Sequence, residues 1–214
     1  MNSRTDTFII SSYGSKIVLS MATLAVLLVL FTGFEFLSFI ALAFLACGLY
    51  TFRNPERVSN FAQHGAIISL LDGKVKEIKS IENSPIDGKH GFEIVVESGF
   101  SDVCILRAPI SSKLSVETLH RGAMLNINSN KSFLNETADI RFESKEGTIL
   151  SRHTLGSFGF PLKFGIDGDI LQNQRYGFFH NGKSSIFLPS NSRVAIKEGM
   201  KIRAGESIIG FFSE

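Results

Sequence analysis

The chain begins with a strongly apolar stretch in which polar positions are almost absent. Between Ile17 and Phe52 the only charged residue is Glu35. One straight helix of this length would extend about 54 Å, well beyond the roughly 30 Å of bilayer hydrocarbon. We therefore predict a break at Gly33–Glu35 and two helical arms, each about 25 Å long. Arms of this length are at the lower limit for a span, so the hairpin either crosses a locally thinned bilayer or enters part of it.

After Gly65 the pattern changes to short apolar or alternating runs, which are typical of β-strands. The runs are Ile67–Leu71, Val75–Ile78, Phe92–Val96, Val103–Leu106, Ile140–Phe142 and Ile186–Leu188. Turn signals separate them at Asp72-Gly73, Asp87-Gly88, Glu146-Gly147, Asp167-Gly168-Asp169 and Asn181-Gly182. No stretch after residue 60 keeps a helical period. The pattern predicts a mainly β fold, a compact antiparallel sandwich or barrel.

The C-terminal segment has a more specific pattern. From Val194 onward, turns at Glu198-Gly199 and Ala204–Glu206 separate short strands, and a looser version with a turn at Gly168-Asp169 occurs in 165–177. This paired arrangement is similar to the barrel-sandwich hybrid of lipoyl and biotinyl domains. No lysine is in the setting that carries a swinging-arm cofactor.

The apolar stretch and its flanks predict three regions: an N-terminal tail (1–15), a membrane hairpin (16–53) and a β domain (54–214). Pro55 disfavours helix at the preceding residue, so the second arm should end near Arg53. Lys16, Arg53 and Arg57 flank the arms, which predicts an inner-membrane protein with both hairpin ends and the β domain on the cytoplasmic side. Either the two arginines contact anionic headgroups, or they form a simple stop-transfer collar.

A signal peptide followed by a buried core helix is the alternative interpretation of the apolar stretch. The run is too long for the apolar region of a signal peptide and has no small-residue cleavage site, so we favour the hairpin.

Composition narrows the possible functions. The formal net charge is +2 and no run of like charges reaches five, so nothing indicates nucleic-acid binding. Two cysteines, Cys47 and Cys104, are compatible with a reducing compartment and no disulfide framework. The five histidines lack the spacing of metal ligands, so no metal is expected.

Several motifs, taken in order, resemble the short, membrane-bound phosphatidylserine decarboxylases. The resembling segments are FRNPER (52–57, family FFRDPER), SLLDGKV (69–75, family SPADGKV), DVCILRAPIS (102–111, family DVHVNRAPVSG), Asn135-Glu136 (family NER), QRYGFF (174–179, family QRFGMI), FLP (187–189, family YLP) and Glu198–Glu206 (family GQKVKAGET). Each motif alone is weak. Their shared order makes the resemblance specific.

The resemblance implies a particular chemistry. Members of this carboxy-lyase family cut their own backbone, usually between Gly and Ser, with the help of a His and an Asp. The new terminal serine becomes a pyruvoyl group, which forms a Schiff base with the substrate amine while CO₂ leaves. Phosphatidylserine thereby becomes phosphatidylethanolamine, and a membrane anchor suits this lipid substrate.

The sequence departs from the family at the processing junction. Counting forward from Gly177 places the processed residue at Lys183, and counting back from Pro189 places it at Gly182. The segment from Gly182 to Ser185 reads GKSS, and neither count puts a hydroxyl directly after a glycine. Because neither lysine nor glycine has a side-chain oxygen or sulfur to attack the backbone, neither can become a pyruvoyl group.

The expected base is also missing. The family histidine falls on Cys104, whose unperturbed thiol pKa near 8.5 suits proton transfer at neutral pH less well than imidazole. Asp72 matches the aspartate that orients that histidine. An aspartate before glycine is also a common structural choice in turns.

A displaced junction is the alternative, with Ser184 presented after Lys183 as the cut site. Leu155–Phe158 resembles the LGST of longer decarboxylases, but it precedes the other blocks of the site, so we interpret it as a turn. His180 is either a displaced base or, as we favour, a histidine in a surface loop.

Three functions follow. Local chemistry favours a decarboxylase-like membrane protein of phospholipid biosynthesis that has lost activity and binds a phosphatidylserine-like headgroup, a second copy of itself or an active paralogue. The second is an active pyruvoyl decarboxylase cut near Ser184, with Asp72 and Cys104 in its site. The third is a membrane-tethered, non-catalytic barrel-sandwich adaptor. Arg107 is the candidate for a headgroup phosphate or carboxylate, with a surface salt bridge as the alternative.

Overall fold

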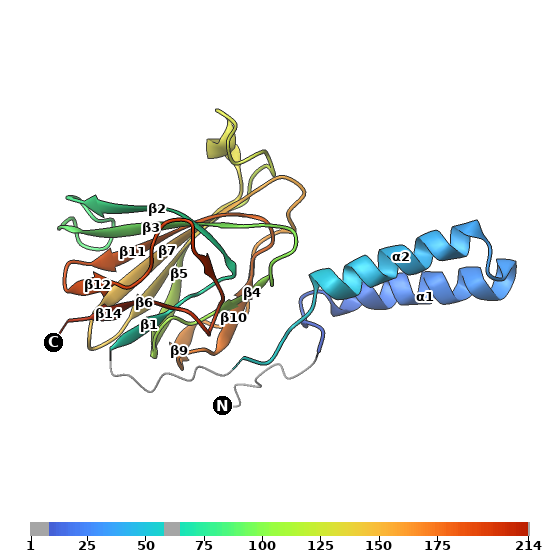
Figure 1. Ribbon diagram of the computed structural model, residues 1–214, viewed down its shortest axis with the longest axis horizontal. Coiled ribbons are helices and arrows are strands. Elements are labelled where there is room, and N and C mark those ends of the chain that lie inside the picture. Colours follow the sequence, from blue (N-terminus) through green and yellow to red (C-terminus); the bar gives the residue numbers. More distant parts are fainter. Residues whose placement is uncertain (1–8, 58–64, 214) are drawn as a thin grey trace. The chain divides into compact units, whose positions relative to one another are not determined.

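The computed structural model in Figure 1 describes residues 9–57 and 65–213. The chain divides into two compact units, Met1–Glu56 and Arg57–Glu214, and each is described by itself.

The first unit is a helical hairpin. α1 (Ser15–Thr32) and α2 (Phe36–Thr51) flank the break that the sequence predicted at Gly33–Glu35. Gly33 has a φ of 74°, a backbone conformation that favours glycine. The buried hydroxyl of Ser38 donates to the Gly33 carbonyl over 2.7 Å, which fixes the turn between the helices.

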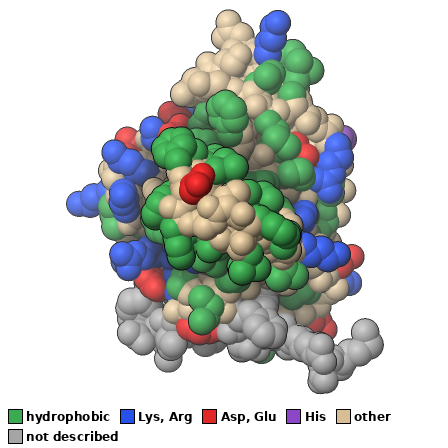
Figure 2. Space-filling model, turned by 90° about the vertical axis from the view of Figure 1, so that its right-hand side faces the viewer, with side chains coloured by type: hydrophobic (Ala, Val, Ile, Leu, Met, Phe, Trp, Pro, Cys, Tyr) green, Lys and Arg blue, Asp and Glu red, His purple; other side chains and the backbone are tan. Residues whose placement is uncertain are grey.

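The outer surface of the hairpin is apolar. Large side chains such as Leu30, Phe31 and Phe36 are exposed, and Figure 2 shows hydrophobic side chains over the hairpin with an acidic side chain among them. By length and composition, α1 can cross a membrane, whereas α2 is a shorter apolar helix of 16 residues. Exposed apolar surface of this extent is typical of a membrane or partner contact.

The second unit is built from antiparallel strands. Their bounds are β1 (Ala66–Ile68), β2 (Gly73–Ile81), β3 (Gly91–Ser98), β4 (Ile105–Arg107), β5 (Ser112–His120), β6 (Thr137–Glu143), β7 (Thr148–Leu155), β8 (Lys163–Phe164), β9 (Gly168–Ile170), β10 (Arg175–Phe178), β11 (Gly182–Pro189), β12 (Ser192–Val194), β13 (Lys201–Ile202) and β14 (Ile208–Phe212). One short 3₁₀ helix, η1 (Ser132–Leu134), lies in the loop between β5 and β6.

The strands form one large and two small sheets. The large sheet has the order β13-β2-β3-β11-β7-β6-β5-β9, and the small ones are β1-β14-β12 and β4-β10-β8. Apolar side chains from all three sheets share one core, for example Ile186 from the large sheet, Ile209 from the first small sheet and Leu106 from the second. The mainly β, antiparallel fold with an N-terminal helical hairpin is therefore as predicted.

Local predictions met different outcomes. All six predicted runs overlap strands, and the turns at Glu198-Gly199 and Ala204–Glu206 are present. The turn predicted at Asp167–Asp169 is wrong, because Gly168 and Asp169 belong to β9 and the turn lies at Gln172-Asn173. The pairing of β9 with β5 explains the difference, since it draws Gly168 into the ladder beside Leu114.

Candidate functional site

The sheet register brings the positions that the sequence singled out to one end of the large sheet. β11 begins at Gly182, and Lys183 pairs with Glu97 on β3. Lys74 on β2 pairs with the same Glu97 from the other side, so two strand spacings, about 10 Å, separate Lys74 from Lys183. Asp72 lies two residues before Lys74, at the same end.

Cys104 reaches this end through the second small sheet. It lies directly before β4, and its carbonyl accepts a hydrogen bond from the Phe179 N–H over 2.8 Å. Phe179 is three residues before Gly182. Asp72, Cys104 and Gly182 therefore come from distant parts of the sequence to one region of the fold.

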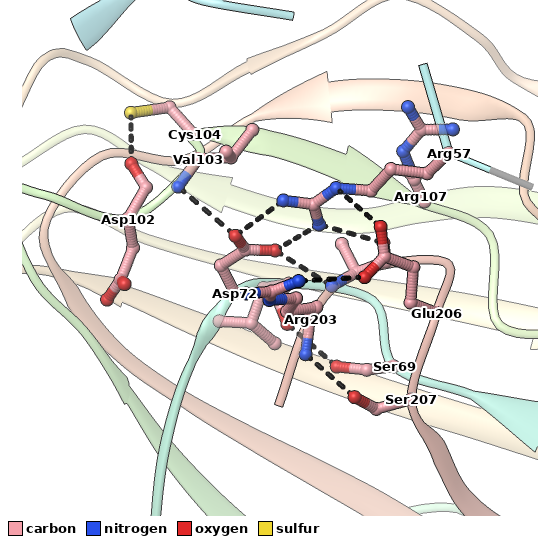
Figure 3. A network of polar contacts seen from close by, with 12 residues as sticks. Arg57, Ser69, Asp72, Asp102, Val103, Cys104, Arg107, Arg203, Glu206 and Ser207 are labelled. Atoms are coloured by element: carbon pink, nitrogen blue, oxygen red, sulfur yellow. Dashed lines mark hydrogen bonds and ion pairs between the residues drawn. The ribbon is translucent and has the colours of Figure 1, made fainter. Parts of the chain in front are cut away.

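The Asp72 carboxylate joins three segments of the domain (Figure 3). The Arg57 guanidinium donates to both carboxylate oxygens, with Nη2 2.7 Å from Oδ2. The Ala204 N–H donates to Oδ1 over 2.8 Å and the Val103 N–H to Oδ2 over 3.4 Å. Because both oxygens already accept hydrogen bonds, this carboxylate acts as a structural clamp.

Arg57 is buried in this clamp, which corrects the expectation that it lies beside lipid headgroups. Its Nη1 also donates to the Ala204 carbonyl over 2.9 Å, and its Nε lies 3.6 Å from Glu206 Oε1. Burial by itself lowers the pKa of Arg57, but the hydrogen bond and charge of Asp72 and the charge of Glu206 raise it overall. The Arg57 guanidinium is therefore bound inside the β domain.

The Cys104 thiol is directed toward the Asp102 carbonyl. Its sulfur lies 3.7 Å from the Asp102 carbonyl oxygen, and Figure 3 shows it directed away from Asp72. The backbone N–H of the intervening Val103 donates to the carboxylate. Asp72 and Cys104, the two positions that the resemblance singles out, are therefore linked through the backbone beside Cys104.

The predicted junction at Gly182–Lys183 has a constrained backbone. Asn181 has a φ of 53°, and a Cβ on Gly182 would lie 2.3 Å from the Thr154 carbonyl oxygen. A glycine is therefore required at 182. The side chain of Lys183 is exposed and carries an amine rather than a hydroxyl, so this position does not fit a pyruvoyl precursor.

Ser184, by contrast, belongs to a buried polar network that the sequence did not reveal. Its hydroxyl lies 2.6 Å from His153 Nδ1, on the neighbouring strand β7. His153 Nε2 lies 3.3 Å from the Ser151 hydroxyl and 3.4 Å from the Tyr176 hydroxyl. The only available signal was the alternation of β7, which places Ser151 and His153 on the same face.

The network is neutral at physiological pH. Burial lowers the His153 pKa to about 4, with a small opposing contribution from the Asp139 charge. Burial also raises the Tyr176 pKa above its ordinary value of 10.0. A neutral imidazole can accept the Ser184 proton, and the pairing thus resembles a nucleophile and a base.

Arg107 is buried, which makes the predicted alternative of a surface salt bridge wrong. Its Nη1 donates to the Asn173 carbonyl and to Asn173 Oδ1 over 3.2 and 3.1 Å. Asn173 in turn donates from Nδ2 to the Arg57 carbonyl over 2.9 Å. Arg107 thus lies next to the clamp, in the interior of the domain.

His180 is also buried, so its interpretation as a surface-loop histidine is wrong. Its ring packs against Phe100 and Phe160, with centroid distances of 5.4 and 5.2 Å. Burial lowers its pKa, and its Nδ1 has no hydrogen-bond partner within the described residues. A buried, unsatisfied nitrogen is thus present two residues before Gly182.

The turn predicted within Leu155–Phe158 is present at Ser157-Phe158, just after β7, and it packs against the predicted junction. The Gly156 N–H donates to the Asn181 carbonyl over 2.8 Å, and Asn181 Nδ2 donates to the Ser157 carbonyl over 2.6 Å. The two segments that resemble processing motifs are therefore neighbours in space.

A groove of about 290 Å³ opens beside Lys183 on the outer side of the sheet. It is lined by Ile127, Ser132, Phe133, Thr137, Arg152, Thr154, Lys183 and Ser185. Arg152 forms a bidentate pair with Asp139 over 2.7 and 2.8 Å. The groove therefore combines hydroxyl groups, an apolar wall and the amine of Lys183.

Within the described residues, no group of three or more His, Cys, Asp or Glu is placed to hold a metal ion.

Comparison with known proteins supports the motif-based prediction. The family model described as phosphatidylserine decarboxylase matches residues 44–210. The chain is 26% identical over 174 residues to a phosphatidylserine decarboxylase proenzyme of Prosthecochloris aestuarii, covering 79% of each protein. It is 28% identical over 198 residues to the proenzyme of Geobacter metallireducens, covering 90% of each. It is 31% identical over 166 residues to that of Amoebophilus asiaticus, covering 75% of this chain and 73% of the relative. The resemblance is confirmed, and the chain belongs to the phosphatidylserine decarboxylase family.

Proposed function

We propose that this family member is attached to a membrane by its helical hairpin, does not cut itself at Gly182–Lys183, and binds phospholipid headgroups. The observation that carries the proposal is the residue after Gly182. Lys183 has no oxygen or sulfur nucleophile, so the acyl shift that precedes pyruvoyl formation has no attacking atom there.

The surroundings of the junction support the same conclusion. The Cys104 thiol is directed to the Asp102 carbonyl, and the Asp72 carboxylate is occupied by Arg57 and two backbone N–H groups. A proton relay between positions 72 and 104 therefore has neither its base nor a free orienting oxygen.

Headgroup binding is supported by the groove beside the junction. The amine of Lys183 and the hydroxyls of Thr137, Thr154 and Ser185 lie around it. This donor set suits a phosphodiester or carboxylate. Arg107 is a second candidate for the same role. A headgroup that binds it would have to replace Asn173 as its hydrogen-bond partner.

Membrane attachment on the cytoplasmic side is supported by the apolar hairpin and by Lys16 and Arg53 at its ends. A second copy of this chain or an active paralogue stays the predicted protein partner.

The intact mass of the purified protein tests the absence of self-cleavage. A single species at 23.5 kDa is expected. Two fragments, of which the C-terminal one is blocked at its start and reacts with carbonyl reagents, would refute the proposal.

Headgroup binding is tested by titrating the full chain, in detergent, with a short-chain phosphatidylserine. K183Q removes the groove amine and should weaken binding about tenfold, the loss expected for a charge-assisted hydrogen bond. K79Q is the matched control, because Lys79 is exposed on β2 and paired with Glu77. Equal affinities of K183Q and K79Q would argue against the groove.

The Ser184–His153 contact favours a second function, an active decarboxylase cut between Lys183 and Ser184. In this reaction the Ser184 Oγ would attack the Lys183 carbonyl carbon, and the C–N bond would break as the hydroxyl proton passes through His153 to the leaving amine. Elimination of the resulting ester and hydrolysis by water, with release of ammonia, would leave the ketone. The burial of Ser184 within a strand paired on both sides opposes this sequence of steps.

The two functions differ in measurable products. Self-cleavage at the displaced junction gives fragments 1–183 and 184–214, and S184A would abolish them. Under the proposed function, the wild type and S184A both remain intact.

A further inference from the structure

We infer that the loops around the start of β11 form a second contact with the bilayer, separate from the hairpin. The contact consists of Phe100, Phe133, Leu134 and Phe158, which we call the aromatic rim. Its occupant is a phospholipid surface, and it would place the open groove beside Lys183 against the headgroups.

The rim side chains are exposed although they are large and apolar. The exposed fractions are 84% for Phe158, 77% for Phe133, 52% for Phe100 and 51% for Leu134. Single exposed apolar residues are common, but four on adjoining loops form a patch of the kind that marks an interaction site.

Contacts around the junction bring the rim together. Phe133 and Lys183 line the same groove, and Phe100 packs edge-on against His180, two residues before Gly182. The turn that carries Phe158 is bonded to Asn181 in both directions, by Gly156 N–H and by the Ser157 carbonyl. Three loops that are distant in sequence therefore present aromatic side chains around one point.

Phe158 also has an unfavourable backbone. Its φ is 55°, in the left-handed region that bulky residues rarely adopt. A strained conformation persists only where surrounding contacts enforce it, and here the Asn181 hydrogen bonds do so. Packing within the β domain gives no reason to hold an exposed aromatic side chain in a strained conformation. A contact between this side chain and another surface would give one.

Charge and position favour a bilayer as the occupant. Lys131 adjoins Phe133 in the η1 loop, and Lys183 lies in the groove. In Figures 1 and 2 this loop projects at the top of the β domain, where hydrophobic side chains adjoin a basic one. Aromatic side chains flanked by lysines are suited to the boundary between headgroups and acyl chains of an anionic membrane. The hairpin of the same chain supplies the attachment that keeps such a surface within reach.

Tryptophan fluorescence can test the rim in the full chain, because the sequence contains no tryptophan. F133W and F158W each introduce a sole reporter at an exposed position of the rim. L171W is the matched control, since Leu171 is 69% exposed and follows β9, at the opposite end of the large sheet. F31W reports on the hairpin. Each variant is reconstituted into vesicles of phosphatidylglycerol and phosphatidylcholine, with or without bromine on the phosphatidylcholine acyl chains.

Bromine should lower the emission of F133W and F158W about twofold, as expected for side chains at the acyl-chain boundary, and leave L171W unchanged. Unquenched rim variants would overturn the inference, and they would leave a protein as the occupant of the rim. Equal quenching of L171W and the rim variants would also overturn it. The inference depends on the proposed membrane attachment, which F31W tests separately: quenching of F31W without quenching at the rim refutes only the rim.

Discussion

At the scale of single residues, the same carboxylate can serve catalysis or structure according to what else binds it. Asp72 matches a catalytic position of the family, yet in this chain its oxygens accept from Arg57, Ala204 and Val103. The partners come from the segment before β1, from the loop before β4 and from the C-terminal turn. Position 104 is a cysteine in this chain, and the clamp by itself gives a structural reason for a carboxylate at position 72.

Replacing Asp72 with Asn tests the clamp. The side chains of Arg57 and Asp72 are only 7% and 10% exposed, so D72N removes the nearer counter-charge of a buried guanidinium and leaves only Glu206, 3.6 Å from its Nε. We expect the free energy of unfolding of the β domain to fall by about 3–5 kcal/mol, measured by urea denaturation in detergent. The control E77Q breaks the exposed Glu77–Lys79 pair and should cost less than about 1 kcal/mol. Equal effects of the two variants would refute the clamp.

His153 predicts a specific dependence of stability on pH. Its pKa is about 4 in the folded chain and near 6.5 when unfolded, so the unfolded state takes up the proton first as pH falls. Above pH 6.5 the neutral His153 leaves the free energy of unfolding at its full value. Between pH 6.5 and 4 the protein loses about 3 kcal/mol of this free energy. H153N, which keeps a polar group beside Ser184 without titrating, should remove this part of the slope. Parallel curves of unfolding free energy against pH for wild type and H153N would contradict the assignment.

The junction can be tested by restoring the missing atoms. K183S supplies a hydroxyl after Gly182, and C104H supplies the imidazole that the family has at that position. We expect K183S alone to remain intact, because position 104 lacks the imidazole of the family, and the double variant C104H/K183S to yield fragments 1–182 and 183–214 by intact mass. Cleavage of K183S at the same rate as the double variant would show that position 104 does not act as the base.

Sequence motifs could locate Asp72, Cys104 and Lys183, because each lies in a short segment with a recognisable order. They could not locate the Ser184–His153 pair. These residues are 31 positions apart, and only the register of β11 against β7 places them opposite each other. Nor could they show that Arg57 and His180 are buried, since burial depends on which loops pack above them.

At the scale of elements, the loop before β6 shows how a family motif can be structural. The Asn135 side chain donates to the Leu125 and Leu155 carbonyls, each over 2.8 Å, and accepts from the Leu125 N–H over 2.9 Å. Glu136 accepts from the Leu162 N–H over 2.7 Å and from Arg121 over 2.5 Å. These two residues therefore fasten the η1 loop to β7 and to the segment before β8.

Removing the Asn135 side chain should release this loop. N135A loses three hydrogen bonds at a buried site and should lower the free energy of unfolding by about 2–4 kcal/mol. Amides of 123–134 should also exchange faster in hydrogen–deuterium exchange. N130A is the control, because Asn130 is exposed on the same loop. Unchanged exchange in N135A would show that other contacts hold the loop.

The strands that sequence reasoning overlooked are explained by their composition. β5 and β7 each carry several polar or charged residues, and β7 directs His153 and Ser151 into the core. A pattern of apolar against polar positions does not recognise a buried face that is itself polar. Runs of consecutive apolar residues, Ile94–Val96 in β3 and Ile186–Leu188 in β11, gave clear signals.

At the scale of the whole molecule, the chain combines a small apolar hairpin with a β domain of ordinary size. The hairpin break was predictable, because Gly33 and Glu35 interrupt an otherwise unbroken apolar stretch. Its helices expose apolar side chains over most of their surface, and burial of such side chains in lipid is worth about 1.5–3 kcal/mol each. An even number of arms returns the chain to the side from which it entered, so the tail and the β domain should share one compartment.

This sidedness can be measured by cysteine labelling in the full chain. In a C47A background the remaining Cys104 is buried and should not react. S12C and K89C then place single exposed thiols before the hairpin and on the β domain. Because the flanking Lys16 and Arg53 favour the cytoplasm, a membrane-impermeant maleimide should label both variants in inside-out vesicles and neither in intact cells. Labelling of the two variants from opposite sides would mean that the apolar region crosses the bilayer once, and the α1–α2 hairpin would then not be the membrane-embedded form.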